Sequence, residues 1–482
     1  MLLNNVLRGV GLTDSEVEVK RVIADSREVK RGDLFVALEG RKNNGHTFID
    51  NAIEKGAVAV VGTARIDGLK VPYIRVENGR LAWAKLIANK YGNPEKHLKF
   101  VGVTGTDGKT TTANLIYEFL KESGYKVGLI STVTAYVGNK SIDTGLHTST
   151  PDPDELWMLL HKMKNVGVEY VVLETTSHGI DQERFGDISF ELGVLTNVAS
   201  DHIDYHKTVE DYARTKAKLF ERSRVAVLHK KTQHLNIFRK AASEKLIYCD
   251  RLTEIRKTKY LMVPNLMQEF EMMVYGDWFK VKTSLLGEFN QENILLAARS
   301  ALSLGVKMET IVVALSKFEG VAGRFNIVKN SLGINIVIDF AHTEQGVGAV
   351  LKLVRENLLT DGNQLIVMLG SNGERDRTKR APMAKMAVTW ADKVIITNED
   401  PRNEDPTQIY EDMVKGCVEK MEKVSRVDDR REAIEKALRM AKKGDWVLLL
   451  GKGHERSMNI KGVEVRWNEL AEVRKLLLKL KN

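Results

Sequence analysis

The stretch that most constrains this 482-residue chain is residues 101–112, VGVTGTDGKTTT. An apolar run from Phe100 to Val103 leads into a glycine-containing turn and then into TTANLIYEFLKESG, whose apolar residues recur at helical spacing. The pattern predicts a buried strand, a glycine turn and a helix N-terminus. Such a turn directs backbone N–H groups and the positive end of a helix dipole at one point, where a phosphate chain can bind.

Within this turn, Lys109 is placed to reach the terminal phosphates of a nucleotide, and the Thr110 hydroxyl suits a Mg²⁺ ion carried by it. The usual P-loop has four residues between its glycines, whereas here two residues separate them. A glycine turn that only happens to precede Lys-Thr therefore stays open as an alternative. The residues expected to bind the nucleotide phosphates are Gly105, Thr106, Asp107, Gly108, Lys109, Thr110 and Thr111.

Length and composition narrow the class of protein. A chain this long predicts two to four domains, and 43% hydrophobic with 28% charged residues is typical of a globular protein. No long apolar segment or leader pattern is visible, so we expect a cytoplasmic protein without membrane insertion. Cys249 and Cys417 stand far apart, which argues against a disulfide framework or a zinc site. The net charge of +9 is spread among 64 acidic residues, which favours an enzyme with anionic substrates over nucleic-acid binding.

Three units are expected along the chain. Residues 1–96 alternate short β-like and helical runs, which predicts a small α/β domain. Its polar turns, Asp25-Ser26-Arg27 and residues 43–46, are only loops when judged from the residues alone. Residues 97–322 contain the phosphate turn, and residues 323–482 again alternate strands and helices, as in a doubly wound α/β domain.

Two strands of the middle unit are predicted to end in groups that could bind a metal. VVLE ends at Glu174, and LTNVASDHIDYH ends in Asp201-His202-Ile203-Asp204. In an open parallel sheet, ligands bind beyond the carboxyl ends of the strands, so both ends should lie beside the phosphate turn. A turn with a helix N-cap is the alternative for the second motif.

The helix that follows, TVEDYARTKAKLFERS, places Lys216 on the same face as Tyr212, Leu219 and Phe220. A lysine on a packed face needs its charge paired or changed. Carbamylation by CO₂ would make it an anion able to bridge metals, and a lysine that snorkels to the surface is the alternative. Later, Asn290 and Asn293 carry amides that can pair with the edge of a base.

Polar clusters also follow the strands predicted in the last unit, where they should converge on one edge of the sheet. They are Asp339 with His342, Arg375 with Asp376, Glu399 to Arg402, and Gly451 to Glu455.

Nine motifs in this order resemble the Mur ligases of peptidoglycan synthesis: GTDGKT, ETTSHGIDQ, LTNVASDHIDYH, YARTKAKLF, GEFNQEN, IDFAHT, GSNGERDRTKR, NEDPRNEDP and GKGHE. The shortened glycine spacing is typical of that family. The resemblance implies an α/β protein of three domains: a UDP-substrate-binding domain (1–96), a P-loop-type ATP-binding domain with a mostly parallel sheet (97–322), and a Rossmann-like amino-acid-binding domain (323–482). The resemblance is greatest to the family members that use ATP to join the third stem-peptide amino acid to UDP-MurNAc-L-Ala-D-Glu through an acyl phosphate. It also implies a monomer.

The resemblance assigns roles residue by residue. Thr110 and Glu174 would hold one Mg²⁺, and His202 with carbamylated Lys216 a second, so that with Lys109 they form the catalytic set. Asn290, Asn293, Arg324 and Asp339 match positions around the adenine, ribose and γ-phosphate of ATP. Ser26 and Arg27 match the uridine diphosphate site, and the muramoyl dipeptide would be held by Ser149, Thr150, Ser177, Gln182 and Arg184.

The pocket for the amino acid is matched by Arg375, Glu399, Asp400, Arg402, Gly451 and Glu455. Family members that add diaminopimelate carry Asp-Asn-Pro-Arg, where the chain has Glu399-Asp400-Pro401-Arg402. Arg402 favours meso-diaminopimelate, which has a carboxylate at its far end. Asp400 adds a negative charge that favours an ammonium, so L-lysine or D-lysine is the rival.

A second departure follows GKGHE, where RSMNIKGVEVRWNELAEV replaces an aspartate-rich ending. Two other interpretations stay open at this point. One is a neighbouring ligase, such as folylpolyglutamate synthetase, and the other is a nucleotide-binding regulator without catalysis.

Overall fold

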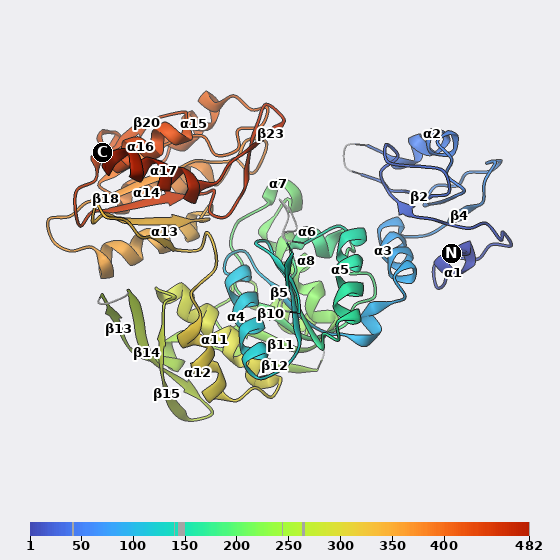
Figure 1. The fold of residues 1–482 in the computed structure, drawn as a ribbon, viewed down its shortest axis with the longest axis horizontal. Coiled ribbons are helices and arrows are strands. Elements are labelled where there is room, and N and C mark those ends of the chain that lie inside the picture. The colour runs from blue at the N-terminus through green and yellow to red at the C-terminus, as the bar shows by residue number, and fades with distance from the viewer. Residues whose placement is uncertain (41–42, 139, 143–149, 243, 263–265, 482) are drawn as a thin grey trace.

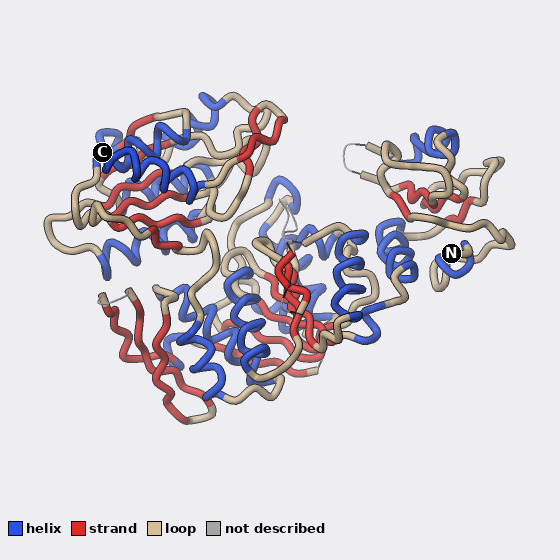
Figure 2. Tube along the Cα trace, viewed as in Figure 1, coloured by secondary structure: helices blue, strands red, loops and turns tan. Residues whose placement is uncertain are grey.

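The computed structural model describes residues 1–40, 43–138, 140–142, 150–242, 244–262 and 266–481. Figure 1 shows three sheet-containing domains in chain order, with the N-terminal and C-terminal domains lying on opposite sides of the central one. Figure 2 shows that helices and strands are mixed in each of them. The expected α/β class with three domains is confirmed, while the boundaries at residues 96 and 322 stay predictions.

In the N-terminal domain, the described residues form a four-stranded parallel sheet in the order β1-β2-β3-β4. β2 and β3 are buried along their whole length, because helices cover the sheet and residues such as Phe35 and Val36 alternate between two apolar clusters. The elements are α1 (Leu3–Val6), β1 (Val22–Ile23), β2 (Leu34–Ala37), α2 (Ile49–Glu54), β3 (Ala59–Gly62), β4 (Tyr73–Arg75) and α3 (Gly79–Lys90).

The central domain is built on an eight-stranded sheet with the order β12-β11-β10-β5-β9-β6-β7-β8, parallel from β12 to β6. The apolar run of the phosphate turn is its inner strand β5, buried from Phe100 to Thr104. Its strands are β5 (Lys99–Thr104), β6 (Val127–Ile130), β7 (Ala135–Val137), β8 (Lys140–Ile142), β9 (Tyr170–Glu174), β10 (Phe190–Leu195), β11 (Ser223–His229) and β12 (Lys245–Cys249).

Helices and a second, smaller sheet complete this domain. β13 (Ile255–Leu261), β14 (Met267–Val274) and β15 (Asp277–Thr283) form an antiparallel sheet that packs against α12. The helices are α4 (Lys109–Glu122), α5 (Pro153–Asn165), α6 (Ser177–Asp181), α7 (Ile203–His206), α8 (Val209–Glu221), α9 (Leu235–Ala241), α10 (Arg251–Glu254), α11 (Glu288–Ser303) and α12 (Met308–Lys317).

The C-terminal domain has a six-stranded sheet with the order β16-β17-β21-β18-β19-β20, parallel except for β16. β22 and β23 form a separate antiparallel hairpin. The strands are β16 (Asn326–Val328), β17 (Asn335–Asp339), β18 (Leu365–Leu369), β19 (Lys393–Ile396), β20 (Val424–Arg426), β21 (Trp446–Leu450), β22 (Ser457–Ile460) and β23 (Val463–Arg466). The helices are α13 (Glu344–Leu353), α14 (Arg380–Trp390), α15 (Pro406–Val414), α16 (Arg430–Met440) and α17 (Glu469–Lys481).

One geometric consequence positions the site. The parallel strands of each large sheet end at a common edge, and residues following the ends of both sheets line one cavity. We also find that no helix among the described residues has the length and apolar character needed to cross a bilayer.

Candidate active site

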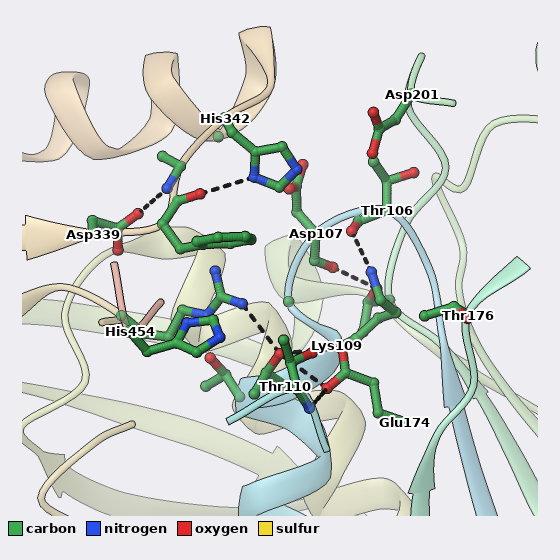
Figure 3. A pocket seen from close by; sticks show the side chains of 18 of the residues that line it. Thr106, Asp107, Lys109, Thr110, Glu174, Thr176, Asp201, Asp339, His342 and His454 are labelled. Atoms are coloured by element: carbon green, nitrogen blue, oxygen red, sulfur yellow. Dashed lines mark hydrogen bonds between the residues drawn. The ribbon is translucent and has the colours of Figure 1, made fainter. Parts of the chain in front are cut away.

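A cavity of about 710 Å³ lies between the central and C-terminal domains. Figure 3 shows Lys109, Thr110 and Glu174 of the central domain facing Asp339, His342 and His454 of the C-terminal domain across it. The cavity therefore joins two groups of residues that are far apart in the sequence.

The phosphate turn is held in shape by two glycines with positive φ, Gly105 (145°) and Gly108 (82°). A Cβ atom on Gly105 would collide with Thr196 Oγ1, and one on Gly108 with Asn293 Oδ1, so both positions exclude side chains. Asn197 supports the turn by accepting hydrogen bonds from the backbone N–H groups of the two residues after Gly105, at 3.2 and 2.9 Å. α4 begins directly after Gly108, as the sequence predicted.

Lys109 and Thr110 occupy the first turn of α4. The Lys109 ammonium donates a hydrogen bond to the Thr106 carbonyl at 2.7 Å. The Thr110 hydroxyl donates to Glu174, 3.1 and 3.2 Å from its two oxygens, and accepts from Arg324 at 3.2 Å. The predicted neighbours Thr110 and Glu174 therefore meet at the ends of two adjacent parallel strands, and Arg324 reaches them from the C-terminal domain.

Asp201 and His202 lie at the next strand exit, and both line the cavity. His202 Nε2 is 3.4 Å from an oxygen of Asp201, whose other oxygen is 3.6 Å from the Lys379 ammonium of the C-terminal domain. Burial lowers the pKa of His202 to about 3, so its imidazole is neutral near pH 7. A neutral imidazole has a free lone pair, which a metal ligand requires.

Lys216 is 1% exposed, because α8 is amphipathic and buries this face against the sheet. Its Nζ donates a hydrogen bond to the Gly105 carbonyl at 2.6 Å and lies 4.1 Å from the centre of the Tyr212 ring. Burial, together with the nearby charge of Lys109, lowers the pKa of Lys216 well below its ordinary value. The snorkelling alternative is wrong, since the amine lies inside the protein next to the phosphate turn.

The residues expected around the muramoyl dipeptide form one connected cluster. Thr150 Oγ1 donates to the Glu174 carbonyl at 2.9 Å, and Arg184 donates to the Thr150 carbonyl at 2.5 Å. Arg184 is also 2.8 Å from Gln182 Oε1, and Ser177 Oγ is 3.0 Å from the ring nitrogen of His206. Thr150, Ser177 and Arg184 line the cavity, Gln182 supports Arg184 from behind, and Ser149 lies outside the described residues.

Ser26 and Arg27 are not brought to this cavity. They lie in the N-terminal domain, where the Arg27 guanidinium pairs with Asp25 at 2.6 Å.

Next to the phosphate turn, α11 presents Asn290 and Asn293, both buried. Asn290 donates to the Leu286 carbonyl at 2.8 Å, and Asn293 donates to Asn290 Oδ1 at 3.2 Å. Phe289, Ala349 and Val350 line the same end as an apolar slot. Sequence analysis missed this slot, because its parts come from helices of two different domains.

Asp339 anchors the start of the C-terminal domain. Its two oxygens accept hydrogen bonds from the backbone N–H groups of Phe325 and Ala341, both at 2.6 Å. Next to it, Thr343 Oγ1 donates to Asp107 at 3.0 Å and so connects the C-terminal domain to the phosphate turn. This contact joins the two sides of the cavity, as do those of Arg324 with Thr110 and of Lys379 with Asp201.

The amino-acid end of the cavity is built by residues that follow β19 and β21. Lys452, 1% exposed, pairs with Asp400 at 2.9 Å and with Glu455 at 2.5 Å. Asp400 also accepts a hydrogen bond from the Asn459 backbone N–H at 3.0 Å. Asp400 lines the cavity with its charge paired to Lys452, and the expectation that this charge favours an ammonium stays a prediction. Lys452 lies in the GKGHE motif, but its partner is 52 residues away and only the fold brings them together.

Arg402 and Arg375 line the cavity at this end, whereas Glu399 is buried and is not among the residues that line it. Burial raises the pKa of Glu399 to about 7. Within the described part of the chain, Glu399 Oε2 and Arg402 Nε are buried and have no hydrogen-bond partner. A Cβ atom on Gly451 would collide with the Glu399 carboxylate, so the glycine gives this group its space. A buried polar atom without a partner, such as Arg402 Nε beside the cavity, is typical of a site completed by a ligand.

Three family models match the chain: "Mur ligase family, catalytic domain" over residues 18–91, "Mur ligase middle domain" over 103–301, and "Mur ligase, glutamate ligase domain" over 323–453. The chain belongs to the Mur ligase family. A Mur ligase of Parabacteroides distasonis, named UDP-N-acetylmuramoyl-L-alanyl-D-glutamate–2,6-diaminopimelate ligase, is 38% identical over 95% of both chains. A protein of the same name from Aquifex aeolicus is 38% identical over 95% of this chain and 94% of its own.

Solved structures of Mur ligases agree with this assignment. A structure titled as the same 2,6-diaminopimelate ligase covers 100% of both chains with a TM-score of 0.67 and 28% identity. MurF ligase from Thermotoga maritima, solved in complex with ADP, has a TM-score of 0.64 over 97% of this chain and 99% of its own, at 22% identity. The latter supports the fold alone.

Proposed function

We propose that this Mur ligase uses ATP to join 2,6-diaminopimelate to UDP-N-acetylmuramoyl-L-alanyl-D-glutamate. The observation that carries the proposal is the single cavity that has a phosphate turn at one end and the Arg402 pocket at the other. The names of the relatives support the choice of substrates. UDP-linked precursors and ATP are both cytoplasmic, so we place the reaction in the cytoplasm. We also expect a monomer.

The chemistry explains why both ends must share one cavity. A carboxylate in water does not acylate an amine, so the acceptor carboxylate must first attack the γ-phosphate of ATP. ADP leaves and an acyl phosphate forms; the substrate amine then attacks its carbonyl and phosphate leaves. Lys109 and Arg324 lie where they can stabilise the transferring phosphoryl group. Closure of the two domains excludes water, which would otherwise hydrolyse the intermediate.

The donor atoms present fit magnesium. Thr110 Oγ1 and the Glu174 carboxylate meet 3.1 Å apart, and hard oxygen ligands of this kind suit Mg²⁺. We propose that they hold one ion and that His202 with modified Lys216 holds a second. Bound Mg²⁺ would supply positive charge that neutralises the phosphate oxygens.

The surroundings of Lys216 support its carbamylation. Burial lowers the pKa of Lys216, which favours the neutral amine, and the neutral amine is the form that attacks CO₂. An N–C bond forms, one proton leaves the nitrogen, and the side chain becomes an anion. Burial disfavours this anion as it disfavours an ammonium, and coordination of the anion to a metal would offset that cost.

The choice between diamino acids is made at the far end of the pocket. With Asp400 paired to Lys452, the Arg402 guanidinium is available to a distal carboxylate, which 2,6-diaminopimelate has and lysine lacks. Lysine is the second candidate, because the carboxylates of Asp400 and Glu455 line the same cavity and would attract an ammonium.

Phosphate release tests the proposal. Purified protein with ATP, Mg²⁺ and the UDP-muramoyl dipeptide should release phosphate only when a diamino acid is added, with 2,6-diaminopimelate preferred. Release with folate and glutamate instead would contradict the proposal, as would ATP binding without acceptor-dependent turnover.

A further inference from the structure

The turn between β18 and α14 carries several cations, and one of them differs from the others in its partners. Arg377 Nη2 lies 2.6 Å from Glu404, and Arg380 Nη1 lies 2.8 Å from the same carboxylate. Among the described residues, the Lys379 ammonium has a single ion-pair partner, Asp201 at 3.6 Å, and no hydrogen bond. Only 11% of the Lys379 side chain is exposed. A nearly buried ammonium without hydrogen bonds is costly unless a ligand supplies an acceptor.

The backbone that carries Lys379 is fixed by the residues on both sides of it. Thr378 donates two hydrogen bonds to Asp376, from its N–H at 2.9 Å and from its hydroxyl at 2.6 Å. Arg380, which is fully buried, donates to the Asn372 carbonyl at 3.0 Å. Lys379 lies between these two anchored residues, directly before α14. A rigid base of this kind suits a group that must meet a ligand in one place.

Lys379 reaches the cavity from the C-terminal domain, whereas Asp201 belongs to the central one. Both line the cavity with His342, and Figure 3 shows Asp201 and His342 on its two sides. Burial, followed by the charge of Lys379, lowers the pKa of His342 to about 4. Burial raises the pKa of Asp201, and the neighbouring His202 lowers it. The ammonium groups of Lys379 and Lys109 lower it further, so that it lies below its ordinary value. Asp201 is thus influenced by one ammonium from each domain.

The anion that fits this place is a phosphoryl group. A carboxylate with one negative charge already faces the Lys379 ammonium, so a ligand must compete with Asp201 to replace it. A phosphoryl group carries more charge and three acceptor oxygens, and it would draw the ammonium away from a partner at 3.6 Å. Lys109 of the phosphate turn influences the same carboxylate, so a phosphoryl group at the turn would have a cation on each side.

We propose that Lys379 is a catalytic residue whose ammonium moves from Asp201 to the transferring phosphoryl group of ATP. This inference rests on the proposed function and adds a cation from the C-terminal domain to it. The acceptor carboxylate forms a bond to the γ-phosphorus, the bond from that phosphorus to the bridging oxygen breaks, and its electron pair leaves with ADP. Lys379 stays protonated throughout and donates hydrogen bonds to the non-bridging oxygens. It then holds the same group in the acyl phosphate until the amine displaces it.

Three variants test this role in turnover. Lys379→Met keeps the packing of the side chain without its charge and should lower kcat about a hundredfold, because a contact to the transferring group is lost. The KM values for ATP, the UDP-muramoyl dipeptide and 2,6-diaminopimelate should each change less than about threefold. Lys379→Arg keeps the charge in a different geometry and should fall between Lys379→Met and the wild type. Lys385→Ala, at an exposed position of α14, should match the wild type.

A binding measurement separates this role from a structural one. Orthovanadate with ADP and Mg²⁺ imitates a transferring phosphoryl group, and calorimetry follows its binding to the protein in the presence of the UDP-muramoyl dipeptide. Lys379→Met should bind orthovanadate about tenfold more weakly than the wild type does, since one charged contact is lost. Its affinity for ADP alone should stay the same, which also shows that the nucleotide site is folded.

A higher KM for one substrate with kcat unchanged would overturn the proposal, because Lys379 would then bind a carboxylate of that substrate. Equal kcat values for Lys379→Met and Lys379→Arg, or for Lys379→Met and the wild type, would also overturn it. A wild-type protein that forms no amide with any diamino acid would contradict the proposed function instead.

Discussion

The two ends of the cavity differ in the partners of their charged side chains. At the phosphate end, the cations of Lys109 and Arg324 make hydrogen bonds to neutral oxygens, of the Thr106 carbonyl and the Thr110 hydroxyl. At the amino-acid end, opposite charges are paired within the protein, as between Lys452 and Asp400. Two cations at the phosphate end are therefore hydrogen-bonded to neutral oxygens, whereas at the amino-acid end Lys452 is shared by two carboxylates and Arg402 Nε has no hydrogen-bond partner among the described residues.

The difference would explain what we propose each end to bind. A polyphosphate is attracted by unpaired positive charge, and affinity rather than discrimination is needed there. 2,6-Diaminopimelate and lysine differ by one carboxylate. Lysine would leave the Arg402 guanidinium without a carboxylate partner, and this would disfavour its binding.

The largest expected effect concerns the phosphate end. Lys216→Ala should lower turnover about a thousandfold, because the charge that stabilises the transition state would be lost with the proposed carbamate. A small carboxylic acid should restore part of the activity, and added bicarbonate should not. Phosphate release measures both.

Lys218→Ala provides the matched control, since Lys218 lies two residues further along α8 on its exposed face. It should keep normal turnover. If Lys216→Ala also kept most of its activity, the carbamate would be ruled out.

A smaller effect is expected from Arg402→Ala at the amino-acid end. It should lower kcat/KM for 2,6-diaminopimelate about a hundredfold and for lysine far less, because only the former has a carboxylate for the guanidinium. Arg402→Lys keeps the charge but not the two-pronged geometry and should fall between. Equal losses for both amino acids would mean that Arg402 is structural.

The pH dependence gives a third test. Burial raises the pKa of Glu399 to about 7, so its carboxyl is protonated below this pH and ionised above it. Glu399 does not line the cavity, but its ionised form adds negative charge next to Asp400 and Glu455, so kcat/KM for an amino acid with a distal ammonium should rise as the pH approaches 7 and level off above it. Glu399→Gln should flatten this rise, and an unchanged profile would assign it to another group.

The smallest effect is expected from Asp400→Asn. Because Asp400 is paired with Lys452, and Lys452 retains Glu455, the preference for 2,6-diaminopimelate over lysine should change less than about threefold. A tenfold or larger shift, measured as the ratio of the two kcat/KM values, would show that the Asp400 charge acts on the substrate.

Local patterns predicted the parts of the fold that depend on neighbouring residues. The strand, turn and helix around Lys109 follow from apolar periodicity and two glycines, and the positions of Glu174 and Asp339 at the edges of two different sheets follow from strand polarity. The packed helical face that carries Lys216 was predicted from three apolar neighbours, while a lysine that snorkels to the surface stayed open as the alternative.

Other parts depend on contacts between distant segments. The pairing of Asp400 with Lys452 joins residues 52 positions apart, so this partner of Asp400 could not be predicted from the sequence. The β22–β23 hairpin was noticed only as a departure from a motif, because its sequence does not indicate that it lines the cavity. Ser26 and Arg27 lie in a different domain, and their distance from the cavity depends on how the domains are arranged.

The most direct test of the central claim is a competition experiment. The enzyme receives ATP, Mg²⁺ and the UDP-muramoyl dipeptide with equal concentrations of meso-diaminopimelate, L-lysine and D-lysine, and mass spectrometry identifies the product. Our account predicts the diaminopimelate adduct as the main product. A main product containing lysine would show that the amino-acid end selects an ammonium without a carboxylate, and would contradict it.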